Sequence, residues 1–334
     1  MNPSMCCAAV GIVVGAMGAV MAAEPAAQAP PPWANKDLKA GIIGCDTSHV
    51  IAFTSLLNSH PRWRVKVVAA FGGGSADMPG ASMKRVEEYT RTLRERHGLE
   101  IVESIDELLK RVDVVLLESV DGRPHLAQAR PVIAAKKPLF IDKPFTAGLA
   151  DAREIIRLAK EAGVPFFSCS CVRFQPEIAK FRKDPGVGKL TKAQGSSPLH
   201  IEPHHPDLFW YGIHGVEALY TVMGRGCVSV SRKVEGDVDY TTGVWRDGRT
   251  GVFRGVHKGS HLPLVKVWGR EREADSGAVN YDYTGLCETI AKFFQTLEVP
   301  IDPLETLEII EFMTAAQLSK ERGGAEVKLE ELRK

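Results

Sequence analysis

Short apolar runs alternate with amphipathic segments along the first half of the chain. The stretches 38–45, 63–71, 112–119, 137–142 and 164–170 have the pattern of strands, and helix-like stretches separate them. The run VDVVLLES is almost continuously apolar, which is typical of a parallel strand covered on both faces. Strands that alternate with helices predict βαβ units around a parallel sheet, whose ligands bind at the carboxyl ends of the strands.

The pattern changes after about residue 170. One helix-like segment at 212–223 precedes four strand-like stretches, and the chain ends in two helices, the second of which begins at Asp302-Pro303. Four short strands with turns between them predict a mainly antiparallel sheet. A length of 334 residues also favours two cores over one. The sequence therefore predicts an α/β protein with a Rossmann-type dinucleotide-binding domain over 37–170 and an α+β substrate domain with C-terminal helices over 171–334.

The first residues form an uncharged apolar segment. No charged side chain occurs from Met5 to Ala23, and a Pro/Ala-rich stretch covers 24–36. This is typical of a signal peptide over 1–23 followed by a linker, although no Lys or Arg precedes the apolar run. We expect an exported protein, periplasmic or secreted, or a cytoplasmic one if the N-terminus is misassigned. We expect no membrane span after cleavage, because no later run is long and apolar enough.

Composition narrows the choice of partners and of chemistry. The formal net charge is +1, so we expect no nucleic-acid partner. The five cysteines beyond the signal segment are too few and too scattered for a disulfide framework. The stretch from His200 to Glu217 is rich in His and acidic residues but lacks zinc-ligand spacing, so we expect no metal there.

The first strand ends at a partial glycine fingerprint. A dinucleotide-binding chain would carry glycines at positions 44, 46 and 49, and here the residues are Gly44, Asp46 and His49. A carboxylate at position 46 would face a phosphate. The alternative is an ordinary strand-to-helix turn that a polar residue caps.

The loop after the second strand, Gly72-Gly73-Gly74-Ser75, lacks the acidic residue that binds a ribose hydroxyl, so NADP is expected as readily as NAD. The nearby Lys84 and Arg85 suit a phosphorylated cofactor. A flexible surface loop is the alternative. The candidate cofactor-binding residues are Gly44, Asp46, Thr47, Ser48, His49, Gly73, Ser75, Ser119, Asp142 and Lys143.

Two further side chains have the placement of acid/base groups. Lys143 follows the predicted strand at 137–142 directly, so it should point into the ligand crevice. His214 and Glu217 are three residues apart and share one helix face, which suits a histidine oriented by a carboxylate. The alternatives are an exposed surface lysine and a helix-start histidine with one satisfied hydrogen bond.

Taken together, these motifs resemble the Gfo/Idh/MocA oxidoreductases, the family of glucose–fructose oxidoreductase and inositol dehydrogenase, over about residues 39–329. Trp210 stands where that family usually has Asp. The resemblance implies that Lys143 and His214 face the nicotinamide and the reacting sugar hydroxyl. The matching segments are Gly41-Ile42-Ile43-Gly44, Asp142-Lys143-Pro144, Arg173-Phe174-Gln175-Pro176 and Gly212-Ile213-His214 with Glu217.

The resemblance implies an NAD(P)-dependent oxidoreductase that transfers hydride between the nicotinamide and a secondary alcohol of a sugar, cyclitol or derivative. Lys143 and His214 would be catalytic, and any homo-oligomer would form through the C-terminal sheet. Two alternatives stay open: an exported carbohydrate hydrolase or lyase that retains NAD for transient oxidation, and a cofactor-free carbohydrate-binding protein. The candidate substrate-binding residues are Arg173, His205, Tyr211 and Glu217.

The position of cleavage is the first testable prediction. The mature chain should begin near Ala23 or Glu24, because small residues before this point suit signal peptidase. N-terminal sequencing of protein from its native host measures this. A sequence that starts at Met1 would contradict it.

Overall fold

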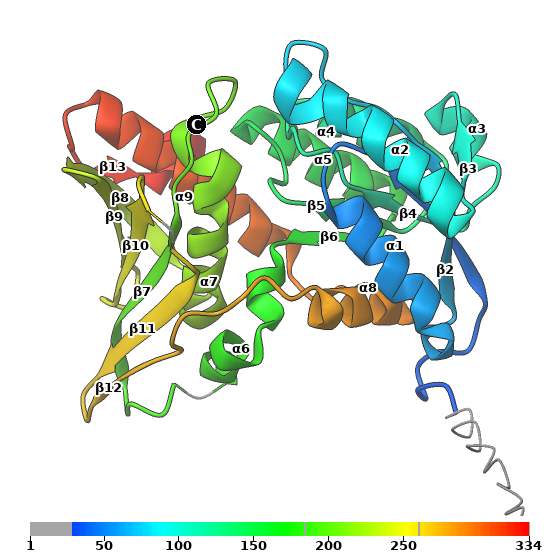
Figure 1. Ribbon diagram of the computed structural model, residues 1–334. Helices are drawn as coiled ribbons and strands as arrows, with labels where there is room; N and C mark the ends of the chain where they lie inside the picture. Colours follow the sequence, from blue (N-terminus) through cyan, green and yellow to red (C-terminus); the bar gives the residue numbers. More distant parts are fainter. Residues whose placement is uncertain (1–28, 184, 260, 334) are drawn as a thin grey trace, which may run out of the picture.

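The computed structural model describes residues 29–183, 185–259 and 261–333, so the predicted signal peptide lies outside the described residues. Two sheets, each with its own helices, lie side by side, and the long C-terminal helix α9 (Pro303–Glu321) runs between them (Figure 1). No helix in the described ranges is long and apolar enough to cross a membrane.

The first sheet has six parallel strands in the order β3-β2-β1-β4-β5-β6, which confirms the predicted parallel sheet. The order reverses between β1 and β4, and the crevice at the carboxyl ends of these strands is where such sheets bind ligands. The strands are β1 (Leu38–Ile43), β2 (Val65–Phe71), β3 (Glu100–Val102), β4 (Val114–Leu117), β5 (Leu139–Asp142) and β6 (Phe166–Cys169).

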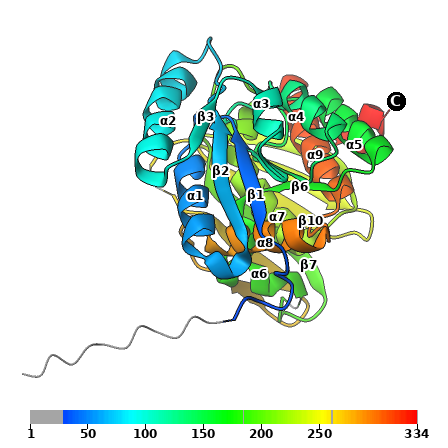
Figure 2. The same ribbon diagram turned by 90° about the vertical axis from the view of Figure 1, so that its right-hand side faces the viewer.

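Helices cover both faces of this sheet, as Figure 2 shows on either side of β1 and β2. One face packs against α1, α2 and α8, and the other against α3, α4 and α5. Helix α8 belongs to the last part of the chain, yet its Cys287 and Ile290 are buried in the same cluster as Ile42 and Phe140. The helices are α1 (His49–Ser59), α2 (Lys84–His97), α3 (Ile105–Leu109), α4 (His125–Ala134), α5 (Leu149–Ala162) and α8 (Thr284–Thr296).

The second sheet has seven strands in the order β12-β11-β7-β10-β9-β8-β13. Only β7 and β10 pair in parallel among the described strands of this sheet, so the mainly antiparallel prediction is confirmed. The strands are β7 (Leu190–Pro198), β8 (Cys227–Glu235), β9 (Val238–Trp245), β10 (Thr250–Val256), β11 (Leu264–Gly269), β12 (Glu273–Asp275) and β13 (Val327–Lys328). The remaining helices are α6 (Pro176–Lys183) and α7 (Ile213–Met223), with single turns η1 (Pro61–Trp63), η2 (Pro79–Met83), η3 (Cys171–Phe174), η4 (Leu208–Gly212) and η5 (Leu329–Arg333).

Strand β7 lies inside the second sheet although its sequence, LTKAQGSSP, lacks a hydrophobic pattern. The small residues of β7 are needed because helix α7 lies very close to this strand. A Cβ atom on Gly195 would come within 2.2 Å of the Gly215 carbonyl oxygen, so only glycine lets α7 lie this close to the strand. This close packing fixes α7, which carries His214, against the sheet.

A buried ion-pair cluster joins the two halves of the chain. Arg173 in η3 is 1% exposed, and its guanidinium contacts Glu217 of α7 and lies 2.5 Å from Glu305 of α9. Burial alone would lower the pKa of Arg173, but the two carboxylates outweigh it and raise the pKa. Arg173 is therefore a fully charged group whose partners neutralise it inside the junction.

Removing that charge should destabilise the fold strongly. Arg173→Met leaves Glu217 and Glu305 without their cation, and breaking a buried pair typically costs about 3–5 kcal/mol. Urea unfolding followed by circular dichroism measures the change. The control is Arg157→Met on α5, whose ion pairs are exposed and should matter far less. Equal losses in the two variants would contradict this account.

Candidate active site

A pocket of about 220 Å³ lies between the carboxyl ends of the first sheet and the start of α7. A larger cavity of about 570 Å³ lies elsewhere, beside α9, and includes none of the predicted site residues, so size alone does not mark the site. The smaller pocket is lined by Thr47, Ser48, His49, Arg85, Tyr89, Val120, Lys143, Trp210, Tyr211, His214, Tyr281 and Tyr283.

The structure brings the two predicted catalytic residues into this one pocket. Lys143 follows the last residue of β5, and its Nζ lies 6.0 Å from the centre of the Tyr211 ring. His214 is the second residue of α7, and its Nδ1 lies 2.7 Å from Ser170 Oγ, which leaves Nε2 for the pocket. Burial, together with the charges of Lys143 and His49, lowers the pKa of His214 well below its usual value. His214 is therefore a neutral imidazole at physiological pH.

A second histidine stands beside this pair. His49 Nδ1 lies 2.6 Å from Asp142 Oδ2, and the ring packs between Phe53 and Tyr283. Burial would raise the pKa of Asp142, but its contacts with His49 and Lys143 outweigh this and lower it. Asp142 is thus a carboxylate that orients His49 and leaves the Nε2 atom available to a ligand. The sequence predicted cofactor contacts for both residues, and in the structure they contact each other.

The first two fingerprint positions have different surroundings. Gly44 has a φ of +86°, and a Cβ atom there would come within 2.1 Å of Ser119 Oγ. The first glycine is thus required by its contact with the end of β4. Asp46 is fully buried: its carboxylate accepts a hydrogen bond from Ser82 Oγ at 2.6 Å and one from the Val120 backbone N–H at 2.8 Å. Burial raises the pKa of Asp46 although both bonds oppose the shift.

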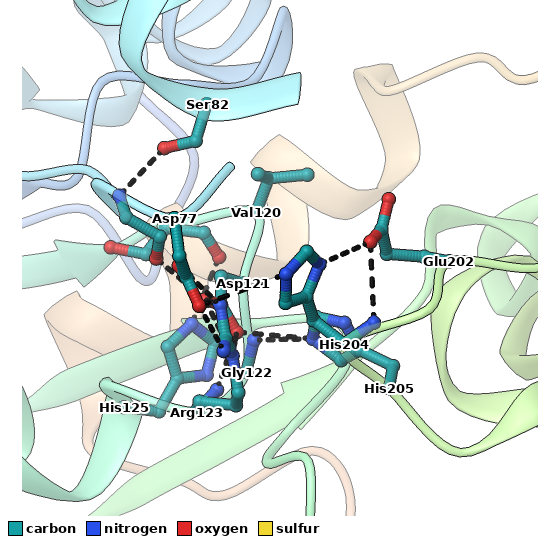
Figure 3. A network of polar contacts seen from close by, with 12 residues as sticks. Asp77, Ser82, Val120, Asp121, Gly122, Arg123, His125, Glu202, His204 and His205 are labelled. Atoms are coloured by element: carbon teal, nitrogen blue, oxygen red, sulfur yellow. Dashed lines mark hydrogen bonds and ion pairs between the residues drawn. The ribbon is translucent and has the colours of Figure 1, made fainter. Parts of the chain in front are cut away.

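The loops after β2 and β4 form a polar network around Asp121 and Arg123 (Figure 3). Ser75 Oγ donates to Asp121 Oδ2 at 2.5 Å, and Arg123 bridges Asp121 and Asp77. His205, from the second half of the chain, approaches the same carboxylate with Nε2 at 3.1 Å from Asp121 Oδ1. Burial would raise the pKa of Asp121, but these partners lower it strongly. The network therefore holds a charged Asp121 closed in by the chain itself.

Some of the remaining predicted residues line the pocket, and others make contacts within the chain instead. Thr47, Ser48 and Tyr211 line the pocket. Ser119 Oγ instead donates to Gln128 at 2.9 Å, and Gly73 packs against Gly44. Three of the predicted substrate contacts lie outside the pocket lining: Arg173 and Glu217 pair with each other, and His205 contacts Asp121.

Several pocket residues were not predicted. Tyr89, Tyr281 and Tyr283 line the pocket, and Asp121 stands behind it. Asp121 follows the end of β4, so the strand-end rule that singled out Lys143 would also have found it. The tyrosines come from loops and from the face of α2, where no sequence rule marks a ligand contact. Within the described residues, no group of three or more His, Cys, Asp or Glu side chains is placed to hold a metal ion.

Comparison with known proteins bears on the first domain and on the fold. Residues 38–169 match a family described as an oxidoreductase family with an NAD-binding Rossmann fold, Gfo/Idh/MocA. A 1,5-anhydro-D-fructose reductase of Ensifer adhaerens is 32% identical over 104 residues, which span 30% of this chain and 30% of that protein.

Solved structures resemble this chain in fold over most of its length. A probable dehydrogenase from Thermotoga maritima has a TM-score of 0.70 at 18% identity, over 88% of this chain and 99% of its own. A scyllo-inositol dehydrogenase from Lactobacillus casei with bound NAD(H) and scyllo-inositol has a TM-score of 0.69 at 12% identity, over 88% and 99%. At these identities the likeness is one of fold, and it confirms the predicted two-domain architecture.

The Gfo/Idh/MocA family supports the prediction of NAD or NADP, because its Rossmann domain is an NAD-binding fold. Some residues of the crevice are compatible with such a cofactor and others are not. Lys143 and His214, which the resemblance predicts to face the nicotinamide, both line the pocket. At the turn after β1, however, the buried Asp46 side chain stands at the glycine position that lets backbone approach a diphosphate. The residues of this turn do not fit a dinucleotide diphosphate.

The lowered pKa of His214 predicts a pH effect on stability. Between pH 7 and pH 5 the unfolded chain binds a proton at this histidine, near pH 6.5, that the folded chain does not bind. Stability should therefore fall as the pH falls through this window. The melting temperature of His214→Gln should fall less between pH 7 and pH 5 than that of the parent. The control His261→Gln changes an exposed histidine, and its melting temperature should fall as much as that of the parent. Equal losses in the parent and His214→Gln would contradict the assignment.

Proposed function

We propose that the chain is an enzyme that acts on a sugar, a cyclitol or a derivative of that class in the pocket between its two sheets. The observation that carries this proposal is the convergence of Lys143, His214 and His49 on one pocket of about 220 Å³. Two of these groups come from the carboxyl edge of the first sheet and one from α7 of the second half, so both halves of the chain are needed.

The pocket suits a small polyol. Its volume lies below the roughly 300–1,000 Å³ of typical drug-sized ligand sites, which favours one sugar or cyclitol ring. Hydroxyl groups of Thr47 and Ser48, together with Tyr211 and Tyr283, can bond to ligand hydroxyls and pack on the ring. The names of the compared proteins support this substrate class, since they include an anhydrofructose reductase and a scyllo-inositol dehydrogenase.

The three titratable groups supply the proton half of an alcohol oxidation. A secondary alcohol must lose its hydroxyl proton when it becomes a ketone, and the neutral imidazole of His214 can accept that proton. The Lys143 ammonium stabilises the oxygen as it becomes negative, and His49, oriented by Asp142, can pass a proton onward. Hydride transfer to NAD(P) would complete the reaction that the family description implies.

Asp46 favours a second candidate function. The same pocket can catalyse a proton-transfer reaction on a carbohydrate without a dinucleotide, because none of these side chains needs one to move a proton. The buried Asp46 at the diphosphate position supports this candidate. A reaction without a dinucleotide could proceed where nicotinamide cofactors are scarce. This candidate function and the uncharged N-terminal segment together support our proposal of an exported protein.

Substitutions at the two catalytic candidates test the proposal. Lys143→Met and His214→Gln should each cut turnover by about 10²–10⁴-fold, the usual contribution of one positioned acid/base group. Turnover is measured on sugars and cyclitols that include scyllo-inositol and 1,5-anhydro-D-fructose, by mass spectrometry of the products with and without added NADH or NADPH.

Matched controls are available on the surface. Lys160→Met on α5 and His261→Gln are exposed and should keep the parent's rate. Product that forms only with added nucleotide supports the oxidoreductase, and product that forms without it supports the second candidate. Parental rates in both pocket variants would contradict the catalytic assignment.

A further inference from the structure

The turn after β1 retains one fingerprint glycine and replaces two. The first glycine of such a fingerprint makes the tight turn, the second lets backbone approach the diphosphate, and the third lets helix and strand pack closely. Gly44 keeps the first role through its contact with Ser119, which needs no ligand. The position whose role depends on the diphosphate now carries Asp46.

Asp46 makes bonds inside the crevice that a bound anion would make. Its carboxylate accepts from the backbone N–H of Val120 at 2.8 Å and from Ser82 Oγ at 2.6 Å. Nearby backbone donors are also used within the chain, since Cys45 N–H donates to Gly72 O at 2.5 Å. An anion site in a Rossmann turn is built from free backbone N–H groups, and the N–H groups of Cys45 and Val120 already have partners within the chain.

The surroundings of Asp46 are acidic and closed. Four carboxyl groups that are at most 1% exposed follow the ends of β1, β4 and β5: Asp46, Glu118, Asp121 and Asp142. The loop that carries Ser75 and Ser82 lies over the turn, tied to Asp46 and Asp121. A diphosphate entering here would have to displace this loop and approach Asp121, whose partners lower its pKa and keep it charged, and repulsion between like charges is costly at protein dielectric.

We infer that Asp46 occupies, from within the chain, the position that the fold provides for the diphosphate, and that it keeps a nicotinamide dinucleotide out of the crevice. The pocket proposed for the carbohydrate is lined by Thr47 and Ser48 and not by Asp46, so it remains open. This inference goes beyond the proposed function and can fail independently of it, because the Lys143 and His214 variants test the pocket by itself.

Restoring the glycine should reopen the site. NADH and NADPH are titrated into the full chain without its first 23 residues, with tryptophan fluorescence and calorimetry as readouts. The parent should show no saturation at about 1 mM, the weak end of specific binding. Asp46→Gly should bind at least about tenfold more tightly, because the carboxylate and its contacts are gone. Asp46 has no positive φ, so glycine relieves no strain there.

Two companion variants keep the test decisive. Asp46→Asn preserves the shape, because its Oδ1 can accept from the Val120 N–H while its Nδ2 donates to Ser82 Oγ, and it should exclude NADH like the parent. Asp46→Ala opens nearly the same space, and alanine loses less backbone entropy on folding than glycine does. It replaces Asp46→Gly in the test if melting curves show that the glycine variant does not fold. Saturable binding by the parent that equals that of Asp46→Gly would overturn the inference. A complete lack of binding in the folded Gly and Ala variants would also overturn it, because Asp46 would then not be the excluding group.

Discussion

The carboxylate of Asp46 is the interaction on which the organisation of the crevice depends. It is fully buried, and its two hydrogen bonds connect the turn after β1 to the loop after β2 and to the backbone after β4. An unpaired buried carboxylate would be far too costly, so these three segments must stay together. The same contacts bring Thr47, Ser48 and His49 to the wall of the pocket. One substitution in a Rossmann turn therefore fixes the shape of the site.

The second half of the chain completes the pocket through close packing of a helix on a strand. Gly195 of β7 and Gly215 of α7 allow the helix to lie against the sheet, and this places His214 opposite Lys143. The buried Arg173, held by Glu217 and Glu305, links the same helix to the junction. The acid/base groups thus lie on rigid elements, which suits catalysis that needs a fixed geometry.

Most of the fold could be predicted from the sequence because each element carries a local signal. The apolar run of β4 and the Asp302 cap of α9, which accepts a hydrogen bond from Leu304 N at 2.9 Å, are examples. Strand β7 could not be predicted, because its small residues are required by close packing against α7, which is distant in sequence. The place of Lys143 and His214 in one pocket could be predicted because strand ends and helix starts mark them. The partners of Asp46, Asp121 and Arg173 could not, because nothing local shows which side chains the fold brings together.

The central claim is that the chain's own polar groups fill the diphosphate position and leave a pocket for one small carbohydrate. The measurement is whether a nucleotide copurifies with the protein. Freshly purified native protein is treated with acid, and the supernatant is analysed by absorbance and mass spectrometry. The account predicts carbohydrate-active protein that releases no NAD or NADP. Release of either nucleotide in a one-to-one ratio with the protein would contradict it.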